Sequence, residues 1–219
     1  MPELVITSDG SHTLFVPELD EHYHSIHGAV QESSIVFIRN GYEFCGDPVV
    51  FILEIGFGTG LNAFLTLVKA QKDKRKVTYT SLEKYPLGKE ITDKLNYQNF
   101  ADDNGSLLFS SIHSAAWGKT INITDNFSLT KINTDFVTCD IKGNFNLIYF
   151  DAFGPDKQPE MWDETLFRKI ASVTRSGGQF VTFSAKGKVK RALRACGFNV
   201  SVLPGPPGKR EIIRGVKIS

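Results

Sequence analysis

A glycine-rich segment preceded by an acid is the first place where the sequence points to chemistry. Residues 54–60 read EIGFGTG, with glycine at every second position. Glycine lets the backbone turn tightly and lets a ligand approach where a Cβ atom would clash. The spacing departs from the G-x-G-x-x-G of dinucleotide sites, and a carboxylate at Glu54 suits a cofactor with positive charge and no phosphate. We therefore expect Glu54, Gly56, Gly58 and Gly60 to bind S-adenosylmethionine, and a glycine turn that binds nothing is the alternative.

Further acids stand where other parts of the same cofactor would lie. Glu83 follows Gly60 by 23 residues and comes just after the next apolar run, where an acid can accept hydrogen bonds from ribose hydroxyls. Asp135 is expected to meet the adenine amino group, and Asp140 is the competing choice. Either aspartate can instead be an ordinary turn residue.

An acid followed by an aromatic residue and a proline forms a second candidate site. The segment DAFGP covers residues 151–155, directly after an apolar run. It resembles the motif with which amino-group methyltransferases hold their target nitrogen. In that arrangement the Asp151 carboxylate accepts the N–H bonds and aims the nitrogen lone pair at the methyl group. Phe153 and Trp162 are expected to stack on a planar base, and packing in the core is the alternative for both.

Three histidines near the N-terminus raise the question of a metal site. His22, His24 and His27 lie close to Glu21 and Glu32 in the sequence. No fourth ligand is spaced to complete a tetrahedral site, so we expect no metal here. A loop beside the substrate, or an ordinary surface, explains these residues better.

Alternating strand and helix patterns from residue 49 onward must position these side chains. Such alternation is typical of a parallel sheet with crossover helices. Strands are expected over residues 49–55, 77–82, 127–132, 145–150 and 179–183, helices over 61–68, from Pro86 to Leu95, over 159–173 and over 188–196, and hairpins at 121–132 and 200–218. Residues 99–118 are polar and are predicted to be irregular.

The expected fold is a doubly wound, Rossmann-like α/β sheet with additions at both ends. Residues 1–48 do not fit the alternation and are predicted to form an N-terminal extension, with a possible helix from Gly28 to Ile38. Residues 49–219 are expected to form the cofactor-binding domain, which closes with a C-terminal β-hairpin. Open sheets of this kind bind ligands at the carboxyl ends of their strands.

Composition excludes several classes of protein. The chain has 219 residues, of which 41% are hydrophobic and 22% charged, and these are ordinary values for a globular domain. No apolar run approaches the ~20 residues that span a bilayer, so we expect no contact with a membrane. The N-terminus lacks the basic and apolar regions of a signal peptide, and the three cysteines are widely spaced. We expect a cytoplasmic protein without a disulfide framework.

The net charge of +1 hides a gradient along the chain. Residues 1–60 contain one basic and nine acidic residues, net −8, whereas residues 180–219 contain nine basic residues and one acid, net +8. This asymmetry suggests a polyanionic partner that docks on the C-terminal part. Ordinary solvated surface charge is the alternative.

Together, these motifs resemble one family over nearly the whole chain. It is the methyltransferase domain of the bifunctional bacterial proteins that make 5-methylaminomethyl-2-thiouridine at the tRNA wobble position, in its stand-alone form. The matching segments are Tyr23, QES at 31–33, VF at 36–37, LEIGFGTGLN at 53–62, EKYPL at 83–87, DAFGP at 151–155, PEMW at 159–162, TFSAKG at 182–187, RAL at 191–193, GF at 197–198 and GKRE at 208–211.

The resemblance implies methyl transfer from S-adenosylmethionine to the amine of 5-aminomethyl-(2-thio)uridine, with Asp151 as the catalytic residue and Glu83 on the ribose. It also implies that the anticodon stem-loop of tRNA is bound and that a separate enzyme supplies the aminomethyl intermediate. The expected substrate-binding residues are Tyr23, Glu32, Phe153, Trp162, Lys186, Lys209 and Arg210. The basic members of this set would hold anticodon phosphates, which position an RNA without reading its sequence.

Two other functions stay open on the sequence alone. An aminopropyltransferase of the spermidine-synthase type also places an acid after the fourth strand, but it favours a small acidic pocket and no basic tail. A non-catalytic RNA-binding module with a vestigial cofactor pocket is the second alternative. The acids Glu54, Glu83 and Asp151 argue against it. The mass of the product tests the first alternative, and cofactor binding without turnover would indicate the second.

Overall fold

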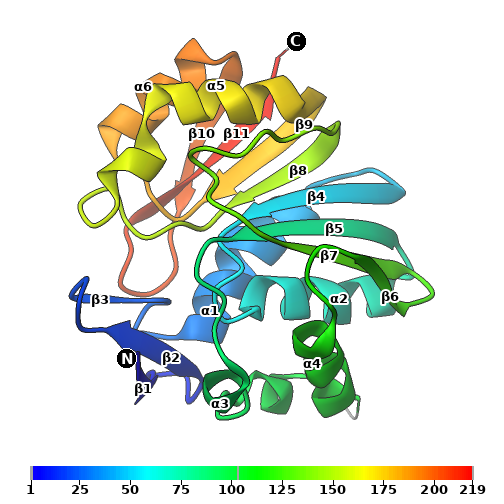
Figure 1. Cartoon of the computed structure of the whole chain (residues 1–219). Helices are drawn as coiled ribbons and strands as arrows, with labels where there is room; N and C mark the ends of the chain where they lie inside the picture. Colours follow the sequence, from blue (N-terminus) through cyan, green and yellow to red (C-terminus); the bar gives the residue numbers. More distant parts are fainter. Residues whose placement is uncertain (1, 103, 219) are drawn as a thin grey trace.

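Eight strands form one central sheet, which is the scaffold for the rest of the molecule (Figure 1). The computed structural model describes residues 2–102 and 104–218. The strands are β4 (Val49–Ile55), β5 (Lys76–Glu83), β6 (Thr120–Thr124), β7 (Phe127–Asn133), β8 (Phe145–Phe150), β9 (Thr174–Thr182), β10 (Phe198–Pro204) and β11 (Glu211–Lys217). Their order in the sheet is β10-β11-β9-β8-β4-β5-β7-β6. The five middle strands from β9 to β7 are parallel, which confirms the expected doubly wound sheet with its C-terminal hairpin.

The central strands are apolar along their length because both faces of the sheet are covered. Every residue of β8 is buried, including Asn146, and β4 is buried from Ile52 to Ile55. Continuous apolar runs are typical of parallel strands that lie between two layers of helices. These runs are the reason that both strands could be predicted with their bounds.

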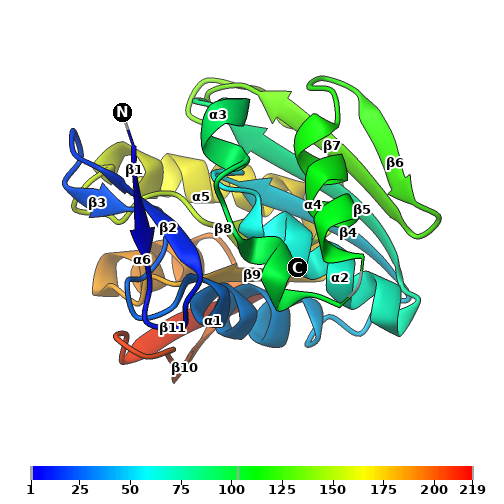
Figure 2. The same ribbon diagram turned by 90° about the horizontal axis from the view of Figure 1, so that it is seen from below.

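Helices cover the two faces of the sheet (Figures 1 and 2). One layer contains α5 (Glu164–Val173) and α6 (Gly187–Ala195), and the other contains α2 (Leu61–Asp73), α4 (Gly105–Ser114) and the π-helical segment η1 (Ser34–Tyr42). Each layer forms its own hydrophobic cluster with the sheet, one around Phe64 and the other around Phe150. No helix within the described ranges is long and apolar enough to cross a membrane.

Residues 99–118 are not irregular as predicted, because they contain α4. The sequence of α4, GSLLFSSIHS, is rich in serine, which is only a moderate helix former and obscured the pattern. Phe109 and Ile112 are nevertheless spaced to share one face of the helix, and both are buried in the core.

The long helix predicted from Pro86 is wrong. The chain forms only α3 (Lys89–Thr92) and a 3-10 turn, η2 (Tyr97–Phe100). Between them the side chain of Asn96 accepts a hydrogen bond from the His12 backbone N–H and donates one to the Gly10 carbonyl, both at 2.9 Å. This contact joins segments far apart in the sequence, so local periodicity cannot reveal it.

The helix predicted over residues 159–173 is interrupted at Asp163. A 3-10 turn, η3 (Pro159–Trp162), precedes α5, and Asp163 lies between them in an extended conformation. Its side chain accepts a hydrogen bond from the Thr165 backbone N–H at 2.9 Å. Asp163 is thus the N-cap of α5 and separates the loop of Phe153 from that helix.

The N-terminal extension consists of a small sheet followed by a helical segment. The sheet contains β1 (Glu3–Ile6), β2 (His12–Val16) and β3 (Glu21–His22), which were not predicted. The helical segment contains α1 (Ala29–Ser33) and η1, so the expected helix is confirmed and continues to Tyr42. The Arg75 guanidinium then donates hydrogen bonds to the carbonyl oxygens of Tyr42, Cys45 and Asp47, which fastens the end of the extension to α2.

Candidate active site

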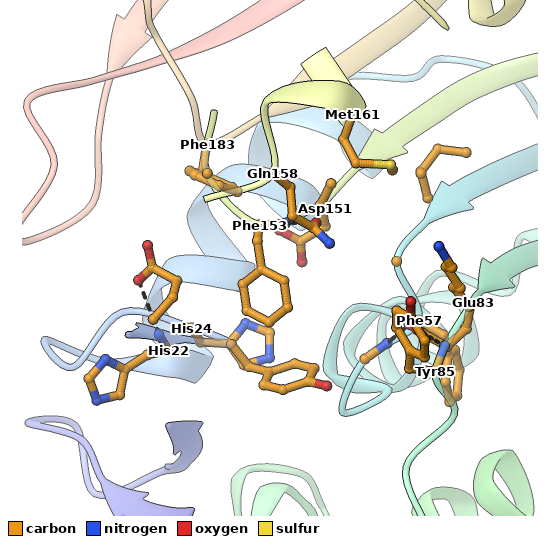
Figure 3. A pocket seen from close by; sticks show the side chains of 18 of the residues that line it. His22, His24, Phe57, Glu83, Tyr85, Asp151, Phe153, Gln158, Met161 and Phe183 are labelled. Atoms are coloured by element: carbon orange, nitrogen blue, oxygen red, sulfur yellow. Dashed lines mark hydrogen bonds between the residues drawn. The ribbon is translucent and has the colours of Figure 1, made fainter. Parts of the chain in front are cut away.

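The main cavity opens where several parallel strands end (Figure 3). It has a volume of about 450 Å³. Its walls come from the glycine loop after β4, from the segments after β5, β7 and β8, and from residues 21–26 of the extension. Ligands of open α/β sheets bind at this edge. The structure thus brings Glu83, Asp135 and Asp151 together around one cavity.

Two glycines of the loop have positive φ angles and no room for a side chain. Gly56 has a φ of +94°, and a Cβ atom there would lie 2.6 Å from the Asp151 carbonyl oxygen. Gly58 has a φ of +51°, and its Cβ would lie 3.0 Å from the Tyr23 ring. Both residues line the cavity. The loop therefore needs glycine here because it lies directly against the segment of Asp151 and against the extension.

Gly60, which was expected to contact the cofactor, begins helix α2 and does not line the cavity. It is the N-cap of α2 with a φ of +74°. A Cβ atom would lie 3.1 Å from both the His113 and the Phe57 side chains. Conformation and packing, and not a ligand, require glycine at this position.

Glu83 at the end of β5 joins the glycine loop to the segment that follows. Its Oε2 accepts a hydrogen bond from the Gly58 N–H at 2.9 Å, and its Oε1 accepts one from the Tyr85 N–H at 2.8 Å. Each carboxylate oxygen has a second lone pair, so these bonds leave room for ligand hydroxyls. In Figure 3, Glu83 and Tyr85 lie on one side of the cavity, and Phe153 and Phe183 lie on the other.

Of the two aspartates considered for the adenine, Asp135 lines the cavity. Its Oδ2 lies 2.8 Å from the Lys84 ammonium, and its Oδ1 accepts the Val137 N–H at 2.9 Å. The hydrogen bonds from Lys84 and Val137 lower the pKa of Asp135 below its usual value. The Asp140 side chain is 82% exposed and lies outside the cavity, so the structure favours Asp135.

Asp151 follows β8 and reaches the cavity from beneath the glycine loop. The side-chain amide of Asn62 donates a hydrogen bond to its Oδ2 at 2.7 Å. The pKa of Asp151 is raised to about 7, because the effects of burial and of Glu32 outweigh those of Asn62 and Lys209, which lower it. A carboxyl group with this pKa can exchange a proton near neutral pH. The sequence analysis did not single out Asn62, whose signal was a polar residue among the apolar ones of the first turn of α2.

Glu54, which was expected to contact the cofactor, lies behind the glycine loop and does not line the cavity. Its side chain is fully buried, and the Ser81 hydroxyl donates a hydrogen bond to its Oε2 at 2.6 Å. Glu54 and Ser81 are in register on the parallel strands β4 and β5. Burial raises the pKa of Glu54 to about 8. The carboxyl group is therefore mainly neutral at pH 7.

The far wall of the cavity is aromatic. The Tyr23 and Phe153 rings pack edge to face with centroids 5.1 Å apart, and Phe183, Met161 and Gln158 lie nearby (Figure 3). This wall suits a flat, partly apolar group such as a nucleobase.

Trp162 is part of the core, which corrects its expected role in stacking on a base. Only 3% of its surface is exposed, and its ring packs on Phe150 with centroids 4.9 Å apart. Its indole N–H donates a hydrogen bond to the Phe153 carbonyl at 2.8 Å. Trp162 thus supports the backbone that carries Phe153.

The N-terminal extension and the C-terminal hairpin meet at the cavity through a half-buried ion pair. Glu32 is 5% exposed and accepts a hydrogen bond from the Ser25 N–H at 2.7 Å. Its partner is the ammonium of Lys209, which lies in the loop of the C-terminal hairpin. The same ammonium is 4.0 Å from the centre of the Phe183 ring. Both members of the pair line the cavity.

The two other basic residues expected at the substrate lie outside the cavity. Lys186 forms a surface ion pair with Asp156. Arg210 is exposed beside Lys209. These positions place both side chains on the surface, where they are available to a large ligand and not to a small one.

Of the histidines near the N-terminus, His22 and His24 line the cavity, and His24 also joins the extension to the glycine loop. His24 is buried, and its Nε2 forms a 2.8 Å hydrogen bond with the hydroxyl of Thr59 in the glycine loop. Burial lowers the pKa of His24 to about 4, so the ring is neutral. The part of the chain that the structure describes contains no group of three histidine, cysteine or acidic residues arranged to hold a metal ion.

A family model described as S-adenosyl-L-methionine-dependent methyltransferase matches residues 109–218. Among curated proteins, the chain is 30% identical to the tRNA 5-methylaminomethyl-2-thiouridine biosynthesis bifunctional protein MnmC of Actinobacillus pleuropneumoniae serotype 5b, over 97% of this chain and 35% of that protein. It is 31% identical to the protein of the same name from Leptospira interrogans serovar copenhageni, over 90% of this chain and 33% of that protein. The chain thus spans about a third of the length of these relatives.

Two solved structures share the fold over the whole chain. MnmC2 from Aquifex aeolicus has a TM-score of 0.81 and 23% identity, and the match covers 100% of this chain and 70% of that one. Spermidine synthase from Thermotoga maritima has a TM-score of 0.61 and 11% identity, over 100% and 72% of the two chains. At these identities the likeness concerns the fold alone.

Proposed function

We propose, on the premise that this chain belongs to the family of S-adenosyl-L-methionine-dependent methyltransferases, that it methylates an amine on the wobble uridine of tRNA. The observation that carries the proposal is the position of Asp151. This half-buried carboxyl group lies in one cavity with the glycine loop and the aromatic wall. The similarity to the MnmC proteins supports the choice of substrate, 5-aminomethyl-(2-thio)uridine.

The residues on one side of the cavity fit the cofactor. Gly56 and Gly58 leave a cradle that a Cβ atom would fill, Glu83 offers acceptors for ribose hydroxyls, and Asp135 offers one for an adenine amino group. When bound, S-adenosylmethionine supplies a methyl group activated by its sulfonium. The chain itself must bind that cofactor, exclude water and orient the amine.

Replacement of Glu83 tests the cofactor side. We expect Glu83→Ala to weaken S-adenosylmethionine binding by about 1 to 3 kcal/mol, because ribose hydroxyls lose a charged acceptor and the Gly58 N–H loses its partner. Isothermal titration calorimetry measures the change. Glu90→Ala, at an exposed acid on α3, is the matched control and should bind as the wild type does. Equal affinity of the Glu83 variant and the wild type would remove Glu83 from the proposed site.

The residues on the other side of the cavity fit a nucleobase that has turned out of the RNA and no longer stacks on its neighbours. We propose that Tyr23, Phe153 and Phe183 hold the uracil, since enzymes that modify a base must expose it and commonly stack it on aromatic rings. Asp151 then accepts the N–H bonds of the aminomethyl group. Glu32 and Lys209 complete the chamber, and two carboxyl groups with one ammonium leave a site suited to a cationic amine.

Nucleoside mass spectrometry tests the proposed reaction in cells. Loss of this protein should cause 5-aminomethyl nucleosides to replace 5-methylaminomethyl nucleosides in tRNA, because a separate enzyme would still supply the unmethylated amine. Re-expression of the wild-type protein should restore the methylated nucleosides, whereas expression of the Asp151→Asn variant should not restore them. An unchanged nucleoside profile in cells without the protein would contradict the proposal. Transfer of an aminopropyl group, the alternative suggested by the shared fold, would give a product of different mass.

The RNA should approach over the basic C-terminal segment, and its affinity should depend on salt. Arg210 is exposed beside Lys209, so we expect it to contact a phosphate at the mouth of the cavity. Each such contact with single-stranded RNA contributes about −0.7 to the slope of log affinity against log salt concentration. Arg210→Ala should therefore flatten that slope by about this amount, as measured by fluorescence anisotropy.

A matched control for the salt experiment is Lys76→Ala. Lys76 is exposed at the start of β5, whereas the end of that strand faces the cavity. Removal of this charge should leave the slope unaltered. If Arg210→Ala and Lys76→Ala gave the same slope as the wild type, Arg210 would be ordinary surface.

A further inference from the structure

A buried asparagine lies between the half-buried Asp151, which lines the cavity, and the fully buried Glu54. Asn62 stands on the first turn of α2 and is 3% exposed. Its Nδ2 donates a hydrogen bond to Asp151 Oδ2 at 2.7 Å. Its amide group also acts on Glu54, where it opposes the rise in that carboxyl group's pKa. Asn62 is thus a neutral group that interacts both with Asp151, which lines the cavity, and with the fully buried Glu54.

Glu54 has no cation to balance a negative charge. In residues 2–102 and 104–218, no basic side chain lies within ion-pair distance of it. Its Oε1, the Asn62 Oδ1 and the Tyr79 hydroxyl are buried without a hydrogen-bond partner. A carboxylate can only accept hydrogen bonds, whereas a neutral carboxyl group can also donate one. A proton on Glu54 therefore removes an unbalanced charge and adds a second possible donor to this cluster, besides the Tyr79 hydroxyl.

We propose that Asn62 is a positioning residue, whose hydrogen bond to Oδ2 fixes the Asp151 carboxylate toward the cavity. The inference rests on the proposed function only in assigning methyl transfer as the reaction in which Asp151 takes part. The effect of Asn62 on the position and the pKa of Asp151 does not depend on it. Asn62 occupies Oδ2, and Oδ1 has no side-chain or backbone partner in the described part of the chain. One oxygen is thereby held by the fold, and the other is left for the substrate amine.

Asn62 also determines how readily Asp151 ionises. The charged or titratable groups that act on Asp151 are Glu32 and Lys209 from the two ends of the chain and Glu54 from β4. The two glutamates disfavour a negative charge there when they are ionised, and Lys209 favours it. The hydrogen bond from Asn62 favours the carboxylate as well. Loss of the Asn62 amide should raise the pKa of Asp151, so that a smaller fraction is ionised at neutral pH.

The test replaces Asn62 and follows Asp151 directly. The variants are Asn62→Ala, which removes the amide, and Asn62→Ser, which keeps a small donor. Carboxyl ¹³C NMR gives the titration midpoint of Asp151, assigned by the signal that Asp151→Asn removes. We expect the midpoint to rise by about one pH unit in Asn62→Ala and by less in Asn62→Ser. The acid limb of the pH profile of kcat should move in the same direction, with the KM for S-adenosylmethionine within about threefold.

Asn146 provides a matched control for a purely structural role. It is also a buried asparagine, at 1% exposure, and its Nδ2 donates to Asp47 Oδ2 at 3.1 Å and to the Val49 carbonyl at 3.0 Å. These partners lie at the start of β4, away from the cavity. Asn146→Ala should lower the melting temperature and leave the Asp151 midpoint where it is in the wild type.

The outcomes separate this inference from the proposed function. A raised midpoint in the Asn62 variants, absent from Asn146→Ala, supports Asn62 as the positioning residue. An unmoved midpoint, or an equal shift in Asn146→Ala, overturns it. If Asn62→Ala does not fold, Asn62→Ser decides by the same readout. If the wild-type chain does not methylate tRNA, the proposed function fails, and the NMR midpoint still decides whether Asn62 controls Asp151.

Discussion

Asp151→Asn should lower the turnover of methyl transfer by about 10²- to 10⁴-fold, the usual contribution of a general base. An aliphatic amine arrives mainly as an ammonium, which has no lone pair with which to attack a methyl group. The Asp151 carboxylate can bind that ammonium, accept its proton and hold the nitrogen in line. Asparagine keeps the shape and one acceptor oxygen but loses the charge and the basicity. Single-turnover assays at saturating S-adenosylmethionine measure the loss, while cofactor affinity should stay within a few-fold.

The pH dependence of the wild type follows from the position of Asp151. Burial raises its pKa to about 7, so turnover should fall as the pH drops below that value and the carboxylate takes up a proton. Part of the loss in Asp151→Asn should be recovered at higher pH, where more of the amine is neutral in solution.

Stability separates a catalytic effect from damage to the fold. The folded pKa of Asp151 is raised above that of an unfolded aspartate, so the folded state favours the neutral form. The contribution of the Asp151 carboxyl group to the free energy of unfolding is therefore present at low pH and is lost as the pH rises through about 7. Asparagine is always neutral, so Asp151→Asn should melt at a temperature equal to or above that of the wild type at pH 8.

Asp156→Asn is the matched control for Asp151→Asn. Asp156 lies in the same loop but is exposed and paired with Lys186, so its replacement should leave turnover within about twofold. Wild-type turnover in Asp151→Asn at neutral pH would show that Asp151 is a structural turn residue.

Gly56→Ala should have the second-largest effect, a loss of about 10²-fold in turnover. A Cβ atom would lie 2.6 Å from the carbonyl oxygen of Asp151, so either the glycine loop or the end of β8 must move. The φ of +94° adds strain for any residue other than glycine. A shift of about 1 Å in either segment changes the alignment of cofactor and amine, and such misplacement alone can cost this much.

Gly177→Ala separates strain from contact with Asp151. Gly177 has a φ of +72°, but no atom lies within 4 Å of the position its Cβ would take. Both variants should lose some thermal stability, and only Gly56→Ala should lose turnover and cofactor affinity. If the two variants had equal activity, the close approach of Gly56 to Asp151 would have no part in catalysis.

The sequence could predict the middle of the fold because its signals there are local. β4 and β8 are continuous apolar runs, and the structure gives both with the predicted bounds. In contrast, β1 to β3 are short and largely exposed at their edges, and α4 is rich in serine. The helix expected from Pro86 to Leu95 is reduced to α3, and the segment after it is held by Asn96, whose partners lie more than 80 residues away. Local patterns contain no information on such contacts.

The sequence could predict where the residues of the candidate site lie along the chain, but not which way their side chains point. Glu83, Asp135 and Asp151 lie at or just after the carboxyl ends of strands. The carboxyl ends of parallel strands meet at one edge of the sheet. Glu54 stands next to the glycine loop in the sequence, yet its side chain is buried against Ser81. Trp162 is likewise near Phe153 in the chain and lies behind it in the core. Which side of the backbone faces the ligand depends on packing that only the folded chain defines.

The contact between Lys209 and Glu32 has a consequence for biosynthesis. β11 lies inside the sheet between β9 and β10, although it is made after both of them on the ribosome. The loop that precedes it delivers Lys209 to Glu32, a residue made 177 positions earlier. The side of the cavity that contains Lys209 therefore cannot form on a nascent chain until the hairpin of β10 and β11 has been made and has inserted into the sheet. A nascent chain that stops before β11 already has its glycine loop, but Glu32 lacks its partner in the β10–β11 loop.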